Sequence, residues 1–259
     1  MTHAEQRVYL INSLLAEESR FSDMELPADE QGQKDLLRSL MNVRMPRPVS
    51  KEFLTIQDEY LIAEREQTGI VDASSLPTIS GYRSIALWQG DITTLKADAI
   101  VNAANSALLG CFRPLHACID NIVHSKSGIE MRLYCNEIMN KQGHEEPAGQ
   151  AKITPGFNLP AKYVLHTVGP IIQGDVTPED EFLLASCYRS CLELAEKHHL
   201  TSLAFCCIST GVFHFPNRRA AEIAVKTVKE YLAEHHSKIK VVFDVYKDKD
   251  YAIYRELLI

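Results

Sequence analysis

The sequence lacks several features that would place it among membrane, secreted or nucleic-acid-binding proteins. It has no run of about 18 apolar residues, and its first residues lack a basic segment followed by an apolar core. Its 27 Lys and Arg are outnumbered by 34 Asp and Glu, for a formal net charge of -7. An acidic chain is a poor nucleic-acid coat, because such proteins present a basic face.

Cysteine is present, but not in the pattern of a secreted disulfide framework. The seven cysteines are an odd number and are spread along 259 residues. We therefore expect reduced thiols and a cytoplasmic protein that binds neither membrane nor nucleic acid. At 46% hydrophobic and 24% charged residues, the chain is long enough for one large domain, or for one domain with a small appendage.

Residues 1–75 differ in texture from the rest and predict three helices. Apolar residues recur at helical spacing around Leu10–Leu15, Leu36–Met41 and Phe53–Ile62, with Pro27 and Pro46–Pro48 between the runs. We predict an N-terminal helical extension over 1–75 and a second domain over 76–259. An appendage packed against that domain is favoured over an independent partner-binding module, because so short a segment buries little surface alone.

From residue 82 the pattern alternates between strands and helices. Helices are predicted over Glu179–His199 and Asn217–His235, and Gly149–Phe157 reads as an antiparallel or edge strand. This rhythm predicts an α/β/α sandwich with a largely parallel sheet, whose ligands gather at the carboxyl ends of the strands. The other predicted strands are Ser84–Trp88, Ala99–Val101, Tyr163–Thr167, Ser202–Ile208 and Val241–Val245.

Three metal-binding residue types follow the predicted strand at Ala99–Val101. Cys111, His116 and Cys118 supply two thiolates and an imidazole within eight residues, one ligand short of a closed tetrahedral zinc site. The same residues could instead pack in the core or form a redox pair. The spacing favours one zinc ion per chain, with a position left for water or substrate.

A second loop, at residues 206–216, follows the predicted strand Ser202–Ile208. It contains Ser209, Thr210 and Gly211 and leads into a helix, so its backbone N–H groups are suited to hold an anion. Gly211 can take a positive φ that other residues avoid. Such turns are common, and the motif alone is weak evidence for phosphate binding. Cys206 and Cys207 are predicted to be buried strand thiols.

Several of these motifs together resemble the macrodomains, the ADP-ribose-binding modules. The run Val101–Gly110 looks like their substrate loop, and Ser209–Pro216 is similar to the loop that cradles pyrophosphate and distal ribose. Gly90–Thr93 is similar to a segment whose aspartate accepts from the adenine amino group, although Asp91 is equally a helix N-cap. Phe243–Tyr246 matches a strand whose last aromatic covers the adenine, with a core role as the alternative.

The loop after Gly110 departs from the glycine run of many hydrolytic macrodomains. It is similar to a zinc-containing microbial subgroup, found beside sirtuin-like transferases, whose ligands are this Cys, His and Cys. Aligning Ala117–Ile119 with the family's Gly-Cys-Ile puts His116 where relatives carry a catalytic aspartate. The resemblance implies catalytic roles for Asn105 and His116. It implies ADP-ribose contacts by Asp91, Ile92, Asn105, Ser209, Thr210, Gly211, Val212, Phe213, Phe215 and Tyr246.

The function implied by the resemblance is removal of mono-ADP-ribose from modified proteins by a zinc-dependent hydrolase, with ester linkages to Asp or Glu expected. A lipoyl-carrier protein modified by a sirtuin-like transferase is the implied partner. One alternative is a reader that binds ADP-ribose without cleaving it, because fold alone does not decide activity. In another, the zinc is structural, with His124 or Cys135 as the fourth ligand.

Overall fold

A computed structural model describes residues 1–21 and 23–259, and its first third is helical. The three predicted helices are α1 (His3–Ala16), α2 (Glu30–Val43) and α3 (Lys51–Thr68), and a 3-10 turn, η1 (Ser19–Phe21), follows α1. Each helix begins at a side chain that accepts from its first-turn backbone, namely Thr2, Asp29 and Ser50. Among the described residues, no helix has the length and apolarity to cross a membrane.

The remainder forms the expected α/β/α arrangement. The helices and 3-10 turns are η2 (Ala73–Ser75), η3 (Ile92–Thr94), α4 (Ile119–Ser127), α5 (Ile129–Gln142), α6 (Pro178–Lys197), α7 (Asn217–Glu234) and α8 (Asp248–Leu258). The strands are β1 (Val71–Asp72), β2 (Ile85–Gln89), β3 (Leu95–Lys96), β4 (Ala99–Ala103), β5 (Ala151–Pro155), β6 (Tyr163–Thr167), β7 (Ser202–Phe205) and β8 (Lys240–Val245).

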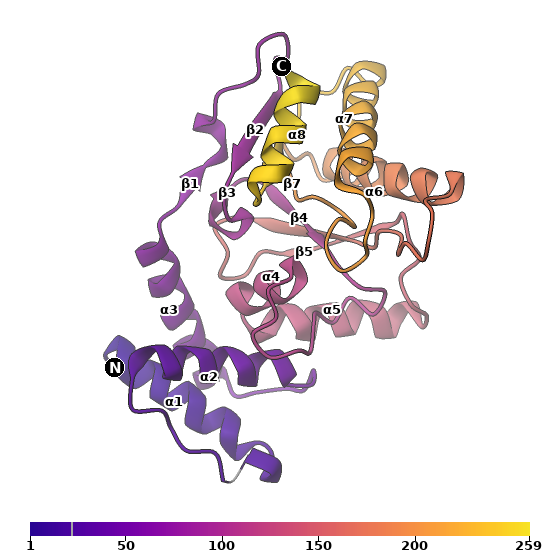
Figure 1. Ribbon diagram of the computed structural model, residues 1–259. Helices are drawn as coiled ribbons and strands as arrows, with labels where there is room; N and C mark the ends of the chain where they lie inside the picture. The colour runs from indigo at the N-terminus through magenta and orange to yellow at the C-terminus, as the bar shows by residue number, and fades with distance from the viewer. Residues whose placement is uncertain (22) are drawn as a thin grey trace.

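The main sheet has the strand order β2-β8-β7-β4-β6-β5, and a short parallel pair joins β1 to β3. All neighbours in the main sheet are parallel except β5, which pairs antiparallel with β6 at the edge. The mixed, largely parallel sheet and the edge position of β5 confirm the sequence-based prediction. Helices α4 and α5 lie between the sheet and the N-terminal helices, and α6, α7 and α8 lie on the other side (Figure 1).

One strand is shorter than predicted. Strand β7 ends at Phe205, so Cys206 and Cys207 lie beyond it. Cys206 is buried, whereas Cys207 is only half-buried and opens the loop that follows. The prediction of two buried strand thiols is therefore wrong in its strand assignment and, for Cys207, in its burial. The apolar run Ser202–Ile208 continues past the last ladder bond because Ile208 packs into the core.

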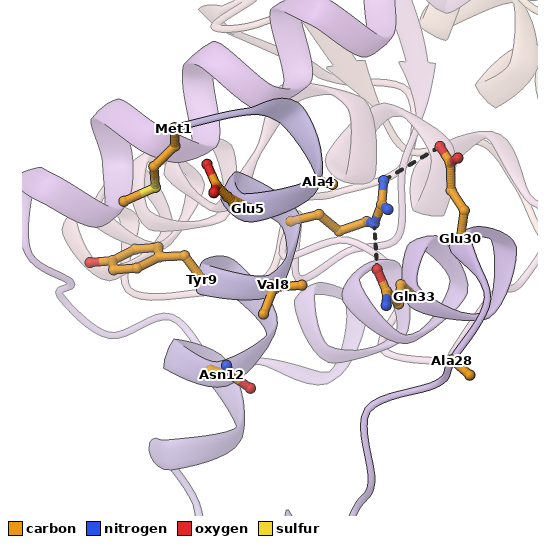
Figure 2. Close-up of a pocket in the computed structure, with 10 residues that line it drawn as sticks. Met1, Ala4, Glu5, Val8, Tyr9, Asn12, Ala28, Glu30 and Gln33 are labelled. Carbon is orange, nitrogen blue, oxygen red and sulfur yellow. Dashed lines mark hydrogen bonds and ion pairs between the residues drawn. The ribbon is translucent and has the colours of Figure 1, made fainter.

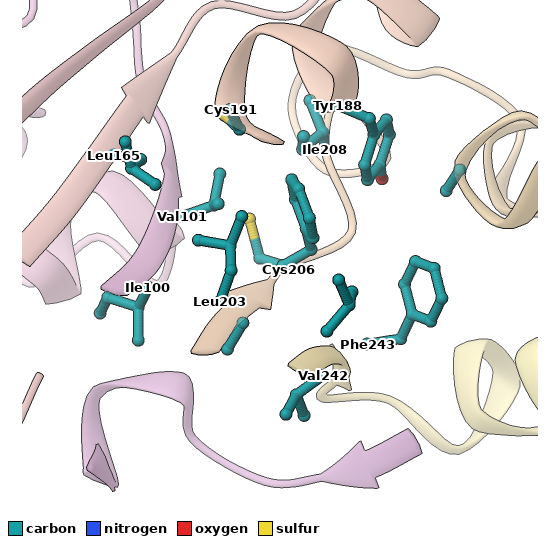
Figure 3. Packing of buried hydrophobic residues seen from close by; sticks show 14 of the residues in the cluster. Ile100, Val101, Leu165, Tyr188, Cys191, Leu203, Cys206, Ile208, Val242 and Phe243 are labelled. Atoms are coloured by element: carbon teal, nitrogen blue, oxygen red, sulfur yellow. The ribbon is translucent and has the colours of Figure 1, made fainter. Parts of the chain in front are cut away.

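Two hydrophobic clusters organise the chain. The large one surrounds the central strands, where residues such as Val101, Leu203 and Phe243 interdigitate with helix residues (Figure 3). The small one is built from α1, α2 and α3, and it also takes in Ile129 at the start of α5. The division at residue 75 stays our proposal; Ala73 already belongs to the large cluster.

Candidate functional site

The carboxyl ends of the parallel strands bring four chain segments to one edge of the sheet. Residues 90–93 follow β2, 104–118 follow β4, 206–216 follow β7 and 246–247 follow β8. Because these strands are neighbours and parallel, their carboxyl ends meet at the same edge. Every site residue predicted from the sequence lies in one of these segments.

The three predicted metal ligands lie together. The ligand atoms of Cys111, His116 and Cys118 are all within 4.8 Å of one another, and the side chains are half-buried. Cys111 Sγ is 3.5 Å from His116 Nδ1. Two ligands of one tetrahedral zinc, with Zn–S of about 2.3 Å and Zn–N of about 2.0 Å, stand about 3.5 Å apart. The donor set and its spacing therefore fit a zinc ion.

Cys118, one of the three predicted metal ligands, is also the N-cap of α4. The backbone N–H of Asn121 donates to its sulfur at 3.4 Å. Burial raises the pKa of the Cys118 thiol to about 11, and the neighbouring Cys111 and Asp120 act in the same direction. Without a cation the thiol stays protonated at neutral pH, so metal binding there releases a proton.

A buried carboxyl, Asp120, lies two residues after Cys118 and contacts Asn105 of the loop that carries the predicted metal ligands. Its Oδ1 accepts from Asn102 Nδ2 at 2.8 Å and its Oδ2 accepts from Asn105 Nδ2 at 3.1 Å. Burial raises its pKa to about 6, although the Asn102 hydrogen bond and Arg132 oppose the rise. Nothing in the sequence singles out Asp120 as a site residue. An aspartate in the first turn of a helix is common, because its negative charge is favoured by the helix dipole.

Asn105 uses its whole amide within this loop. Its Nδ2 donates to Gly110 O at 3.0 Å as well as to Asp120, and its Oδ1 accepts from Ala107 N at 3.1 Å. As it stands, the residue can offer a ribose hydroxyl only the second lone pair of Oδ1. An N–H contact to the ligand requires one of the two internal bonds to break.

A second group of metal-binding types is buried beneath the site. His124, Cys135 and His166 offer ligand atoms within 4.8 Å of one another. Both ring nitrogens of His166 are already engaged, with Asn102 Nδ2 at 3.1 Å and Thr154 Oγ1 at 2.9 Å. His166 therefore has no ring nitrogen free for a metal. His124 and Cys135 belong to this buried group and not to the loop group, so the structural-zinc alternative gains no fourth ligand from them.

The second predicted loop has the features of an anion site, with one correction. Gly211 does not carry the positive φ; Ser209 and His214 do, at 64° and 60°. A Cβ built on Gly211 meets nothing within 4 Å, so the glycine leaves open space beside the loop. Within the part of the chain that the structure describes, the N–H groups of Gly211, Val212 and Phe213 donate to no protein acceptor. They form the candidate nest.

The remaining predicted contacts divide between surface and core. Asp91 is half-buried and caps η3 through its Oδ1, which accepts from Thr93 N at 2.9 Å. Tyr246 is 77% exposed, which leaves its ring free to cover a ligand. Ile92 and Phe215 have their side chains in the large core cluster, so only their backbones can contact a ligand.

Two further side chains at this end of the sheet each have a buried oxygen without a hydrogen-bond partner among the described residues. Ser209 is buried, and its hydroxyl has no hydrogen-bond partner among the described residues. Asp244, on β8 in register with Trp88, is also buried, and one of its carboxyl oxygens has none. Burial, together with the nearby Asp91, holds the pKa of Asp244 well above its usual range. The strand pattern around Asp244 gives no sign of this, because the residue sits in an apolar run.

A hollow lies elsewhere, among the N-terminal helices. It is lined by residues of α1 and of the segment that begins α2, and Arg7 there donates to Gln33 and pairs with Glu30 (Figure 2). None of the predicted site residues lines it. This hollow and the candidate site are therefore different places on the molecule.

The fold is a three-layer α/β arrangement, and the candidate ligand site lies at the carboxyl ends of the parallel strands of its mixed sheet. The Macro domain model matches residues 101–224. A protein-ADP-ribose hydrolase of Treponema medium is 55% identical over 100% of both chains. One of Staphylococcus aureus (strain MSSA476) is 51% identical over 96% of this chain and 93% of its own.

A solved structure agrees with these relatives. The Trypanosoma brucei macrodomain in complex with ADP-ribose is 30% identical, covers 85% of this chain and 94% of its own, and has a TM-score of 0.67. The chain belongs to the macrodomain family.

Proposed function

We propose that this protein is a zinc-dependent protein-ADP-ribose hydrolase that removes mono-ADP-ribose from modified proteins, with ester linkages to Asp or Glu as the preferred bond. The main observation behind this proposal is the grouping of Cys111, His116 and Cys118. They offer three ligand atoms for a metal, and no fourth described residue belongs to their group. The names of the relatives of Treponema medium and Staphylococcus aureus support the same activity.

The protein's own groups would bind and orient the nucleotide along the sheet edge. Asp91 keeps Oδ2 available for the adenine amino group, and Tyr246 is exposed enough to cover the ring. The N–H groups of residues 211–213 would hold the pyrophosphate, which places the distal ribose toward the Asn105 loop. Fixing the diphosphate in this way would orient the scissile bond, and holding reacting groups in the right geometry contributes strongly to catalysis.

At the distal ribose, His116 and the two thiolates would hold the metal, and Asn105 would contact a ribose hydroxyl through Oδ1. When bound, zinc supplies a Lewis acid that can polarise ribose hydroxyls or lower the pKa of a water. His116 acts as a ligand in this scheme, and its catalytic role is exercised through the metal.

The expected linkage follows from the leaving group. A carboxylate released from an ester needs little protonation, whereas a serine alkoxide or a guanidine calls for a general acid. Asp120 is poorly placed for that task, because both of its oxygens already accept hydrogen bonds from asparagine amides. We therefore expect acidic-residue esters to be cleaved faster than serine or arginine linkages. A lipoyl-carrier protein modified by a sirtuin-like transferase remains the proposed substrate.

The first test is metal content with activity. Purified protein should hold one zinc per chain by mass spectrometry, and Cys118→Ala should lose the metal and the activity while ADP-ribose binding persists in calorimetry. Wild-type protein without stoichiometric zinc would refute the metal assignment. Zinc-loaded protein that binds ADP-ribose but releases none from any modified protein would identify the alternative, a reader.

The second test separates the linkages. Proteins carrying a single ADP-ribose on glutamate, serine or arginine are incubated with the enzyme, and released ADP-ribose is measured by mass spectrometry. Glutamate release should be fastest. Faster release from serine or arginine would overturn the linkage assignment while leaving the hydrolase activity standing.

A further inference from the structure

We propose that helix α2 of the N-terminal extension is a working part of the metal site, with Arg38 and Asn42 as positioning residues that hold the ligand loop. The inference rests on the proposed metal function and extends it to two residues outside the macrodomain match. That match spans residues 101–224. The two residues are one helical turn apart, so they lie on the same face of α2.

Arg38 contacts one proposed ligand, His116, and also Asn121, the residue that holds the loop through several hydrogen bonds. Its Nη2 donates to the carbonyl of His116 at 3.0 Å and to Asn121 Oδ1 at 2.8 Å. Fixing the His116 carbonyl orients that residue's peptide, and with it the side of the chain from which the imidazole projects. The guanidinium is suited to this because its planar, rigid donors reach two acceptors at once.

Asn121, which Arg38 holds, ties both ends of the loop together. Its Nδ2 donates to Cys111 O at 3.3 Å and to Arg113 O at 2.9 Å, and its backbone N–H donates to Cys118 Sγ at 3.4 Å. The residue is fully buried. All three metal ligands are therefore within one or two hydrogen bonds of Arg38.

Asn42 holds the middle of the loop. Its Oδ1 accepts from the backbone N–H of Leu115 at 3.1 Å, and Leu115 has a φ of 54° just before His116. Its Nδ2 donates to Ser125 Oγ at 2.9 Å, and that hydroxyl donates to Asn121 O at 2.7 Å. A strained residue adjacent to a ligand keeps its conformation only while its surroundings enforce it.

Arg132 fastens the same helix to the start of the loop. Its Nη1 donates to the carbonyls of Met41 and Arg44 at 2.9 and 2.6 Å, and its Nε donates to Leu109 O at 2.7 Å. Its guanidinium also lies over the ring of Phe112, which follows Cys111, at 4.3 Å from the centroid. These bonds anchor the end of α2 that carries Asn42, so the face bearing Arg38 and Asn42 is held in register with the ligands.

The test uses full-length protein and zinc alone as the probe. Zinc affinity is measured by competition with a chromogenic chelator for the wild type, Arg38→Leu, Asn42→Leu and the milder Arg38→Lys. Lys34→Ala is the matched control, because Lys34 lies on α2 one turn before Arg38 and pairs with Glu30 and Glu64. Thermal unfolding of each metal-free variant is recorded alongside.

Loss of the groups that orient metal ligands typically weakens metal binding about 10–100-fold. We expect a loss of that size in Arg38→Leu and Asn42→Leu, a smaller loss in Arg38→Lys, and wild-type affinity in Lys34→Ala. The cobalt-substituted variants should also show altered visible absorption, since those bands report ligand geometry.

The outcomes separate the two proposals. One outcome would overturn this inference alone. Zinc affinity would be that of the wild type in both Arg38 variants and in Asn42→Leu, and any drop in unfolding temperature would be equal in metal-free and zinc-loaded protein. Helix α2 would then only pack against the loop. A wild type that binds no zinc would overturn the proposed metal function and this inference with it. If the leucine variants do not fold, the affinity of Arg38→Lys decides the question.

Discussion

Asn105 illustrates how much of this site is decided by single hydrogen bonds. Both of its amide hydrogens and one lone pair of its oxygen are used within the loop. It thereby joins the first turn of the loop to Gly110, one residue before Cys111, the first proposed metal ligand, and to Asp120 in helix α4. The residue proposed to contact the ribose therefore also stabilises the loop that carries the proposed metal ligands.

At the same scale, Gly211 should be replaceable by alanine but not by glutamate. A Cβ there meets no atom within 4 Å and φ is not positive, so Gly211→Ala should fold with stability within about 0.5 kcal/mol of the wild type. Gly211→Glu should also fold, yet lose ADP-ribose binding, because its carboxylate fills and repels the phosphate position. Calorimetry with both variants checks this, and equal affinity in wild type and Gly211→Glu would remove the phosphate-loop assignment.

Gly110 should tolerate no side chain, for two separable reasons. Its φ is +78°, and a Cβ would lie 2.8 Å from His124 Cγ. We expect Gly110→Ala to destabilise the protein and to lower its zinc content, because Cys111 is the next residue.

Gly143→Ala is the matched control for this substitution. Gly143 has a similar φ of +76° but open space around it, so it isolates the backbone cost, about 1–2 kcal/mol for a left-handed residue. Chemical denaturation and metal analysis of both variants measure the difference. Equal losses in the two variants would mean that the contact with His124 is unimportant.

At the scale of elements, helix α5 depends on the extension for its first turn. Gly128 precedes it and has no side chain to cap it. The backbone N–H of Ile129 instead donates to Gln57 Oε1 of α3 at 2.9 Å, across 72 residues of sequence. Ile129 also packs in the small cluster. The extension and the macrodomain therefore share an element.

Replacing Gln57 should lower the free energy of unfolding about as much as removing an ordinary helix N-cap. Gln57→Leu keeps the volume of the buried side chain but leaves a buried N–H unpaired, and we expect a loss of about 1–2 kcal/mol in urea unfolding. Thr55→Ala, at an exposed position of the same helix, serves as control and should stay within about 0.5 kcal/mol. A loss no larger than that of Thr55→Ala would show that the N–H finds another partner.

At the scale of the whole molecule, Asp98 joins strands at the amino-terminal end of the sheet, opposite the candidate site. Its carboxylate accepts from Lys162 Nζ at 2.7 Å and from Thr201 N at 2.7 Å. Asp98, Lys162 and Thr201 immediately precede β4, β6 and β7, so one side chain joins the amino ends of three parallel strands. These contacts at the amino ends of the strands stabilise the sheet, and the candidate ligand site lies at the carboxyl ends.

Stability should therefore depend on the ionisation of Asp98 in acid. Partial burial would raise its pKa, but the hydrogen bonds from Lys162 and Thr201 outweigh that and lower it from 3.8 to about 2. A depressed native pKa contributes stability that is complete above the unfolded value and is lost as pH falls toward the native one. We expect Asp98→Asn to be less stable at neutral pH and to lose less stability than the wild type between pH 3.8 and 2. Urea unfolding across that range measures it, and parallel curves for the two proteins would contradict the assignment.

The sequence predicted the three N-terminal helices, helices α6 and α7, the six strands of the main sheet and their order along the chain. Apolar periodicity predicted the helices and strands, since it reports which face of a local segment is buried. The alternation of strands with helices predicted a parallel sheet, and a parallel sheet brings the loops after its strands to one edge. The grouping of Cys111, His116 and Cys118 was predictable for the same reason, because all three lie within eight residues of one loop.

Which atoms of the site residues are free to contact a ligand depends on the tertiary structure. The positive φ at Ser209 and His214 in place of Gly211 depends on how the loop closes on itself, which the composition of the loop does not reveal. The hydrogen bond from Arg38 to Asn121 joins residues 83 positions apart, and that from the backbone N–H of Ile129 to Gln57 joins residues 72 apart. Sequence patterns report neighbours along the chain, whereas these contacts exist only because α2 and α3 pack against the helices beneath the sheet.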